Sequence, residues 1–125
     1  MRAIVIDDSR TMRIILKKML MEAGFEVLEA GHGKEALERL KEAGPMDLAL
    51  VDWNMPEMNG YEFVCAVRQN PVYKDLRLMM VTTETESGQV SKALEAGANE
   101  YMMKPFTKEA IFEKLSLMGL GRATE

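Results

Sequence analysis

Polar side chains stand at the ends of four short apolar runs. Asp7 and Asp8 close the first run, and Asp52 closes another. A third run ends at the hydroxyl side chain of Thr82, and a fourth is followed by the amine of Lys104. Carboxylates, a hydroxyl and an amine are the groups that a divalent metal ion and a phosphoryl group need together. If these runs are neighbouring parallel strands, their ends form one polar site.

Three carboxylates in one place need a compensating charge, because two of them about 5 Å apart repel by roughly 3 kcal/mol at an effective dielectric near 20. Mg²⁺ is suited to this role, since it prefers oxygen ligands. Phosphoryl transfer to a carboxylate needs an ionised oxygen, with positive charge around the phosphoryl oxygens. Asp52 is the central candidate acceptor, Lys104 supplies a positive charge and Thr82 a hydrogen bond. Asp8 taken alone also suits the N-cap of the helix that comes after it.

The apolar pattern alternates between short runs and stretches with a helical period, which is typical of βα units around a parallel sheet. We expect strands at about 2–7, 25–30, 47–52, 77–82 and 99–103. Helices are expected at about 10–23, 34–43, 60–69, 87–97 and 107–118. Residues suited to N-caps and to helix ends support these boundaries: Ser9, Ser87, Thr107, Gly24, Gly44 and Gly97. The first helix is expected to bury a stripe of Met12, Ile15, Leu16, Met19 and Leu20.

The composition of the strands predicts their order. Runs 3–6, 48–51 and 78–81 are apolar throughout, as expected of strands covered on both faces. The strands at 25–30 and 99–103 contain charged residues and suit the edges. Order 2-1-3-4-5 satisfies both placements with right-handed crossovers. We therefore expect a doubly wound, five-stranded parallel sheet in a three-layer α/β/α fold. Ligands of such sheets bind at the carboxyl edge where the strand order reverses, which is where the acidic residues stand.

The composition also limits the function. A length of 125 residues suits one domain, expected to span 1–125. The net charge of −4 argues against direct binding of nucleic acid, which requires a basic face. The single cysteine, Cys65, allows no intrachain disulfide and fits a reducing compartment. No apolar run approaches the roughly 20 residues of a membrane span, and the chain starts with a predicted strand instead of a signal peptide. We expect a cytoplasmic protein with no membrane association.

Short motifs follow one another along the chain: Asp7-Asp8, Asp52-Trp53-Asn54-Met55-Pro56, Asn59-Gly60, Thr82, Gly97-Ala98, Tyr101 and Lys104-Pro105-Phe106. In combination they resemble the receiver domain of two-component response regulators, over essentially the whole chain. The likeness is greatest to stand-alone chemotaxis regulators of the CheY type, notably in residues 52–56. This resemblance implies a flavodoxin-like (CheY-like) fold.

The resemblance also implies roles for the acidic residues. Asp52 would be the phosphoacceptor, receiving phosphate from a sensor histidine kinase or a phosphotransfer protein. Asp8 and Asp52, with the backbone carbonyl of Asn54, would ligate Mg²⁺, and Asp7 would act largely through a coordinated water. Such a protein is a signalling switch and not an enzyme acting on a separate substrate. It is expected to phosphorylate itself from small phosphodonors and to dephosphorylate itself slowly.

The remaining motif residues would read out the phosphoryl group. Thr82 and Lys104 would bind it, and Tyr101 would turn inward as Thr82 moves. The surface formed by the fourth helix, fifth strand and fifth helix would then change and control a downstream protein in chemotaxis or a related two-component pathway. Tyr101 could instead be a fixed core aromatic. Thr83 is larger than the residue usual after the switch hydroxyl, so narrower access to the acceptor is expected. We expect a monomer.

Three other functions compete with the receiver interpretation. A dehalogenase-like phosphatase needs an Asp-x-Asp spacing that residues 7–9 lack. A flavodoxin-like electron carrier needs a hydroxyl-rich phosphate loop after the first strand, where the two aspartates would repel the flavin phosphate. The third is a receiver excised from a longer response regulator with a DNA-binding or enzymatic output domain. This last alternative stays open, because the sequence cannot tell whether the natural chain continues beyond Glu125.

Overall fold

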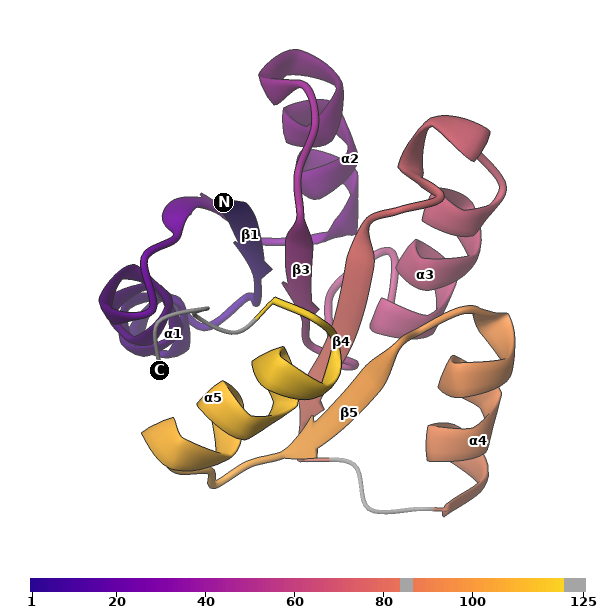
Figure 1. Ribbon diagram of the computed structural model, residues 1–125. Coiled ribbons are helices and arrows are strands. Elements are labelled where there is room, and N and C mark those ends of the chain that lie inside the picture. The colour runs from indigo at the N-terminus through magenta and orange to yellow at the C-terminus, as the bar shows by residue number, and fades with distance from the viewer. Residues whose placement is uncertain (84–86, 121–125) are drawn as a thin grey trace.

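The structure is a computed structural model that describes residues 1–83 and 87–120. Within these ranges, five strands and five helices alternate along the chain (Figure 1). The strands are β1 (Arg2–Ile6), β2 (Glu26–Ala30), β3 (Leu48–Val51), β4 (Arg77–Thr82) and β5 (Glu100–Met103). The helices are α1 (Arg10–Glu22), α2 (Gly33–Ala43), α3 (Gly60–Arg68), α4 (Ser87–Ala96) and α5 (Lys108–Leu117). A 3₁₀ turn at Pro71–Tyr73, which the sequence analysis did not predict, leads from α3 towards β4.

The element boundaries lie within one residue of the predicted ones, because cap residues stop and start the helices as expected. Ser9 accepts from the N–H of the third residue of α1, and Thr107 caps α5 in the same way. α4 begins at Ser87, whose side chain lies outside the described part of the chain, so a cap there stays a prediction. His32 caps α2, with Nδ1 accepting from the N–H of Glu35 at 3.2 Å, a role the sequence analysis missed.

The sheet has the order β2-β1-β3-β4-β5, and every pairing between its neighbours is parallel, which confirms the predicted topology. α1 and α5 cover one face, and α2, α3 and α4 cover the other (Figure 1). The predicted doubly wound α/β/α fold is therefore correct. The last paired residues of β1 and β3 are Ile6 and Val51, so the next residues of the two strands emerge side by side. This is the point at which the strand order reverses, between β1 and β3.

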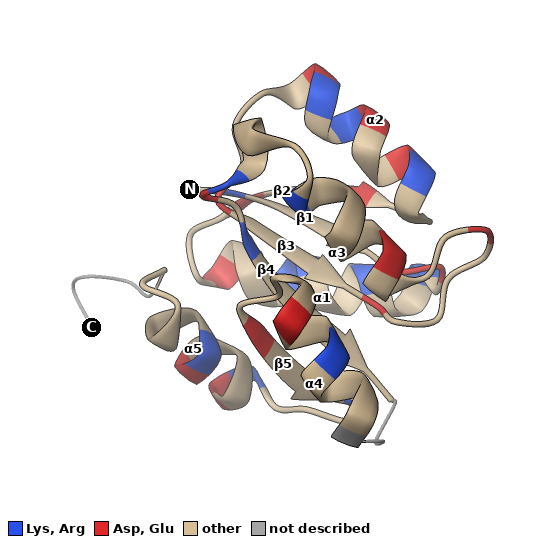
Figure 2. Cartoon of the chain, turned by 90° about the vertical axis from the view of Figure 1, so that its right-hand side faces the viewer, with Lys and Arg blue, Asp and Glu red and all other residues tan. Residues whose placement is uncertain are grey.

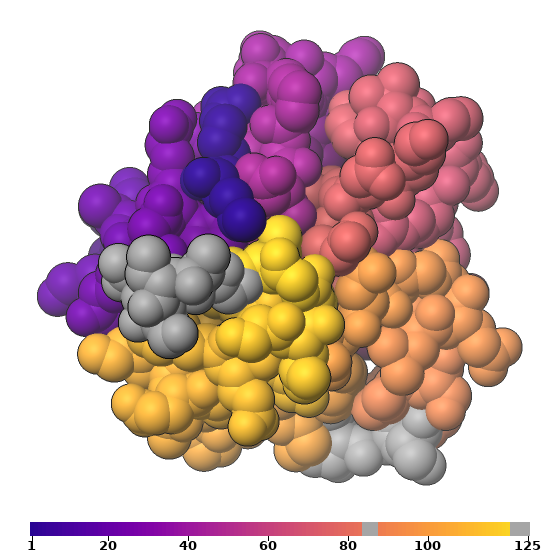
Figure 3. Space-filling model, in the orientation of Figure 1, coloured from indigo at the N-terminus to yellow at the C-terminus, as the bar shows by residue number. Residues whose placement is uncertain are grey.

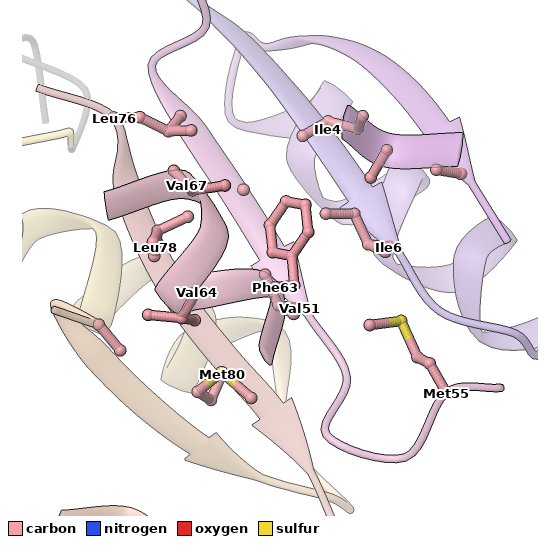
Figure 4. Close-up of a cluster of buried hydrophobic side chains, with 14 of the residues drawn as sticks. Ile4, Ile6, Val51, Met55, Phe63, Val64, Val67, Leu76, Leu78 and Met80 are labelled. Atoms are coloured by element: carbon pink, nitrogen blue, oxygen red, sulfur yellow. The ribbon is translucent and has the colours of Figure 1, made fainter. Parts of the chain in front are cut away.

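A buried cluster holds the α2, α3 and α4 face together. Phe63 points from α3 towards the sheet and lies beside Ile6 and Val51, with no exposed surface of its own (Figure 4). The opposite cluster joins α1 and α5 to the sheet. There the predicted stripe of α1 is narrower than expected, because Ile15 is 39% exposed while Leu16 is buried. The prediction that Ile15 is buried was wrong.

At the amino edge of the sheet, opposite the acidic residues, two arginine side chains donate hydrogen bonds to backbone carbonyl oxygens. Arg68 of α3 donates to the carbonyl oxygens of Gly97 at 2.9 Å and of Leu76 at 2.6 Å. Arg77 donates to the carbonyl oxygen of Met118, and the yellow end of α5 lies next to the salmon segment that leads into β4 (Figure 3). Both contacts anchor helix ends to the strand edge by charge-assisted hydrogen bonds.

Charges of both signs alternate along α2 and α5 (Figure 2). Neither helix therefore presents a uniformly basic surface of the kind that nucleic acid binding requires. None of the helices in the described ranges is long and apolar enough to cross a bilayer.

Candidate functional site

The three acidic residues meet at the carboxyl edge of the sheet. The backbone N–H of Asp52 donates to the carbonyl oxygen of Ile6 at 3.0 Å, which extends the pairing of β1 and β3 past their ends. Asp7, Asp8 and Asp52 each place a carboxylate oxygen within 4.8 Å of the others. Asp7 is 1% exposed and Asp52 7%, whereas Asp8 is open to solvent. The predicted acidic cluster is present, with two buried members and one accessible one.

Lys104 brings a cation into this cluster from the far edge of the sheet. Its Nζ lies 3.0 Å from Oδ2 of Asp7 and 3.5 Å from Oδ1 of Asp52. Its backbone N–H donates to the carbonyl oxygen of Thr82 at 2.9 Å, so the pairing of β4 and β5 fixes where the side chain starts. The Lys104-Pro105 peptide is cis. The predicted convergence of acids and amine is thus seen in the structure.

Asp7 is held at four of its atoms. Its Oδ1 accepts from the backbone N–H of Ser9 at 2.8 Å, and its own N–H donates to the carbonyl oxygen of Ala30 at 3.1 Å. Nη1 of Arg13 donates to its carbonyl oxygen at 2.6 Å, and Lys104 binds Oδ2. Arg13 was not among the predicted site residues. In the sequence it is one of two arginines, with Arg10, in the first turn of the helix that follows the acidic pair.

The environment of Asp52 disfavours its charge. The pKa of the Asp52 carboxyl is raised from an ordinary value of 3.8 to about 6. Burial is the largest cause of this rise and the nearby Asp7 carboxylate the next; Lys104 opposes the rise, and Asp8 adds a smaller increase. One amine therefore does not balance three carboxylates. A cation bound at the cluster would favour the ionised form, because an opposite charge within a few ångströms stabilises it.

The donor set fits a small hard cation. Mg²⁺ takes oxygen ligands at about 2.0–2.1 Å, so opposite ligands lie about 4.2 Å apart. Carboxylate oxygens that already lie within 4.8 Å of one another need little movement to reach such spacing. Asn54 lies two residues after Asp52 and is exposed. Its predicted contribution, through its backbone carbonyl, stays a prediction.

The predicted switch residues lie on β4 and β5. Thr82 is the last residue of β4 and has no exposed surface. Tyr101 pairs in register with Met80 and is half-buried against the α2, α3 and α4 core cluster. Thr83, the residue directly after β4, is exposed. Val51 pairs with Met80, so Thr82 lies on β4 one residue beyond the position that is level with Asp52. Tyr101 lies on β5, the edge strand next to β4.

Trp53 connects the site to α3 and α4. The residue is 8% exposed, and its ring stacks on that of Tyr61 with centroids 6.0 Å apart and an interplanar angle of 28°. Nζ of Lys92 lies 4.5 Å from the centre of the Tyr61 ring, which is a cation–π distance. A buried indole directly after Asp52 is well placed to report charge changes at the cluster.

Comparison with known proteins agrees with this geometry. The family model of the response regulator receiver domain matches residues 3–116. The chain is 45% identical over 119 residues to chemotaxis protein CheY1 of Helicobacter pylori, covering 94% of this chain and 96% of that protein. It is 46% identical over 123 residues to the chemotaxis protein CheY homolog of Campylobacter jejuni, covering 97% and 95%.

Solved structures include both stand-alone and longer proteins. Chemotaxis protein CheY4 of Vibrio cholerae superposes with a TM-score of 0.87 at 35% identity, covering 94% of this chain and 97% of that chain. A probable two-component system response regulator/GGDEF domain protein superposes with a TM-score of 0.88 at 30% identity, covering 94% of this chain but 48% of the other. The chain belongs to the response regulator receiver domain family and is similar, over most of its length, to chemotaxis regulators of the CheY type.

Proposed function

We propose that the chain is a Mg²⁺-dependent phosphoacceptor switch, formed by a single receiver domain over residues 1–125, in which Asp52 receives the phosphoryl group. The observation that carries this proposal is the strand-end cluster, where Asp52 lies between two further carboxylates and the amine of Lys104. Three crowded carboxylates destabilise the metal-free site, which gives the cluster a high affinity for positive charge. Asp7, Asp8, Asp52 and the carbonyl of Asn54 would hold Mg²⁺, which supplies positive charge to the carboxylates and to the phosphoryl oxygens.

The chemistry is a displacement at phosphorus. An ionised oxygen of Asp52 forms a bond to phosphorus as the P–N bond to a kinase or phosphotransfer imidazole breaks. The imidazole nitrogen keeps the electron pair and takes up a proton. Lys104, already within 3.5 Å of Asp52, then binds a phosphoryl oxygen, and the hydroxyl of Thr82 donates to another. Water later attacks phosphorus as the P–O bond to Asp52 breaks; the Asp52 carboxylate keeps the electron pair, and inorganic phosphate is released. Small phosphodonors serve in place of the imidazole.

The output belongs to the surface of α4, β5 and α5. The new charge draws Thr82 towards the site, and Tyr101 packs inward from β5 behind it, so that a local charge change biases a two-state element. Leu94 of α4 and Met103 of β5 are 44% and 42% exposed, so this surface offers apolar side chains to a protein partner. The partner acts in chemotaxis or a related two-component pathway. A cytoplasmic monomer is part of this proposal.

The test uses Trp53 fluorescence. Metal-free protein is titrated with Mg²⁺ and then with acetyl phosphate, alongside Asp52→Asn. Quenching by Mg²⁺, followed by a donor-dependent change that Asp52→Asn lacks, is the expected result. Asp75→Asn is the matched control, because it makes the same substitution at an exposed carboxylate outside the cluster. A wild-type protein that responds to neither reagent would contradict the proposal.

A second candidate is a receiver that acts on an attached output domain. The match to half of the response regulator/GGDEF domain protein favours it. An immunoblot of native cells separates the two candidates. A product of 125 residues supports a separate partner, and a longer product supports an attached output domain.

A further inference from the structure

Arg13 contacts the site without belonging to the acidic cluster. It lies in the first turn of α1, where its own N–H donates to the carbonyl oxygen of Ser9 at 3.0 Å. Its Nη1 donates to the carbonyl oxygen of Asp7 at 2.6 Å, and its Nε donates to Oε1 of Glu29 on β2 at 3.2 Å. The side chain is 19% exposed. The guanidinium is therefore held between a helix, an edge strand and the end of β1.

The contact with Asp7 bears on the next residue. A peptide group is planar and contains both neighbouring Cα atoms, so a carbonyl fixed in direction also fixes the Cα that comes after it. The peptide before Asp7 is fixed by its N–H bond to Ala30, and the peptide after it by Arg13. Asp8 is the exposed member of the cluster, and no ion pair with another residue of 1–83 or 87–120 orients its carboxylate. The Arg13 hydrogen bond fixes the peptide before Asp8, and the bond from the Ser9 N–H to Asp7 Oδ1 fixes the peptide after it, so the two bonds together set where the Asp8 side chain starts.

We propose that Arg13 is a positioning residue for cation binding: it holds the peptide between Asp7 and Asp8 so that the Asp8 carboxylate faces the other two acids. The inference rests on the proposed function, since it concerns the site that would bind Mg²⁺. Groups that orient metal ligands through hydrogen bonds commonly change metal affinity about 10- to 100-fold when removed. Arg13 is such a group, acting through a backbone carbonyl.

Charge alone predicts the opposite effect. Arg13 carries a positive charge near the cluster, and removing it reduces repulsion of an incoming cation. If Arg13 acted only through its charge, its removal would tighten Mg²⁺ binding. If it positions Asp8, its removal weakens binding. The sign of the change therefore separates the two roles.

Lys17 provides the matched control. It lies one turn later on α1 and binds the same carboxylate, with Nζ 3.4 Å from Oε2 of Glu29, but it has no contact with Asp7. Arg13→Met and Lys17→Met each remove one positive charge from the same helix and one partner from Glu29. Mg²⁺ affinity is measured by isothermal titration calorimetry on metal-free protein at fixed ionic strength, because salt screens the charge effect. Arg13→Gln replaces Arg13→Met if the latter does not fold.

We expect Arg13→Met to bind Mg²⁺ about tenfold more weakly than wild type, and Lys17→Met to bind it as tightly or slightly more tightly. The acetyl phosphate reaction of Arg13→Met should need more Mg²⁺ but reach the wild-type rate at saturation. In metal-free ¹H–¹⁵N spectra, the Asp8 amide should shift in Arg13→Met and stay in place in Lys17→Met. Unchanged or tighter Mg²⁺ binding by Arg13→Met would overturn the inference. Failure of wild type itself to bind Mg²⁺ would instead refute the proposed function.

Discussion

The replacement Asp52→Asn should stabilise the metal-free protein at neutral pH. The side chain is 7% exposed, and it lies among carboxylates that one lysine does not balance. An amide of nearly the same shape removes the buried charge and its repulsion of Asp7 and Asp8. It weakens one contact of Lys104, which keeps its closer partner, Asp7, at 3.0 Å. The loss of repulsion should therefore outweigh the loss of attraction.

The pKa of Asp52 gives the size and the pH range of the effect. A tenfold change in a protonation equilibrium is worth about 1.4 kcal/mol. The pKa of Asp52 rises from 3.8 in the unfolded chain to about 6 in the folded protein. At a pH where Asp52 is ionised in both states, this rise lowers the free energy of unfolding by about 3 kcal/mol. Because the pKa of Asp52 is higher in the folded protein, the stability that its protonated form contributes is fully present below pH 3.8 and is lost as the pH rises through 6.

Urea denaturation in EDTA buffer, monitored by circular dichroism between about pH 4 and 8, measures this difference. We expect Asp52→Asn to exceed wild type by about 3 kcal/mol near pH 7.5 and by much less near pH 4. Asp75→Asn should stay within about 0.5 kcal/mol of wild type, as exposed substitutions usually do. Mg²⁺ at about 100 times its dissociation constant should add about 2.7 kcal/mol to wild type and less to the variant. A variant no more stable than wild type at neutral pH, or an advantage independent of pH, would refute the reasoning.

Further substitutions test other contacts, each by urea denaturation in EDTA buffer. Lys104→Met leaves Asp7 buried without its cation, so it should lower the free energy of unfolding by about 3 kcal/mol; an unchanged value would mean that the ion pair is not formed. Gly60→Ala places a Cβ against the backbone carbonyl oxygen of Asp52 and 2.7 Å from the methyl group of Met80, and it should cost about 2 kcal/mol. Gly88→Ala places its Cβ in open space on α4 and should raise the free energy of unfolding by about 0.5 kcal/mol. A Gly88→Ala variant that is less stable than Gly60→Ala would contradict the packing argument. His32→Ala removes the α2 cap and should cost about 1 kcal/mol, whereas replacement by Asn, which also caps, should not.

Local patterns were enough to predict the elements and the edge of the sheet at which they present polar groups. Strands covered on both faces must be apolar, so the polar residues that end them are visible in the sequence. Caps and glycines mark helix ends because they satisfy free backbone groups or adopt positive φ, as Gly97 does at +119°. Asp52 and Thr82 could therefore be assigned to one edge of the sheet from strand composition alone.

The same patterns did not predict which helix residues are buried, because burial depends on how closely each helix packs against the sheet. A helical period places Ile15 beside Leu16 on the inner stripe of α1, yet Ile15 is 39% exposed. The period gives the direction of a side chain but not the width of the face that the sheet covers. His32 was missed as a cap for a related reason, since its role depends on the orientation of its ring in the folded loop.

The sequence by itself determined which residues stand at strand ends, because alternation and apolar content are local properties of the chain. Tertiary structure alone decided how those residues meet. Lys104 and Asp7 are 97 positions apart, and their 3.0 Å contact depends on the register of the paired strands. The raised pKa of Asp52 depends on burial by surrounding elements, and the Arg13 contact on how α1 returns to the end of β1. These are properties of distance in space, which spacing along the chain does not specify.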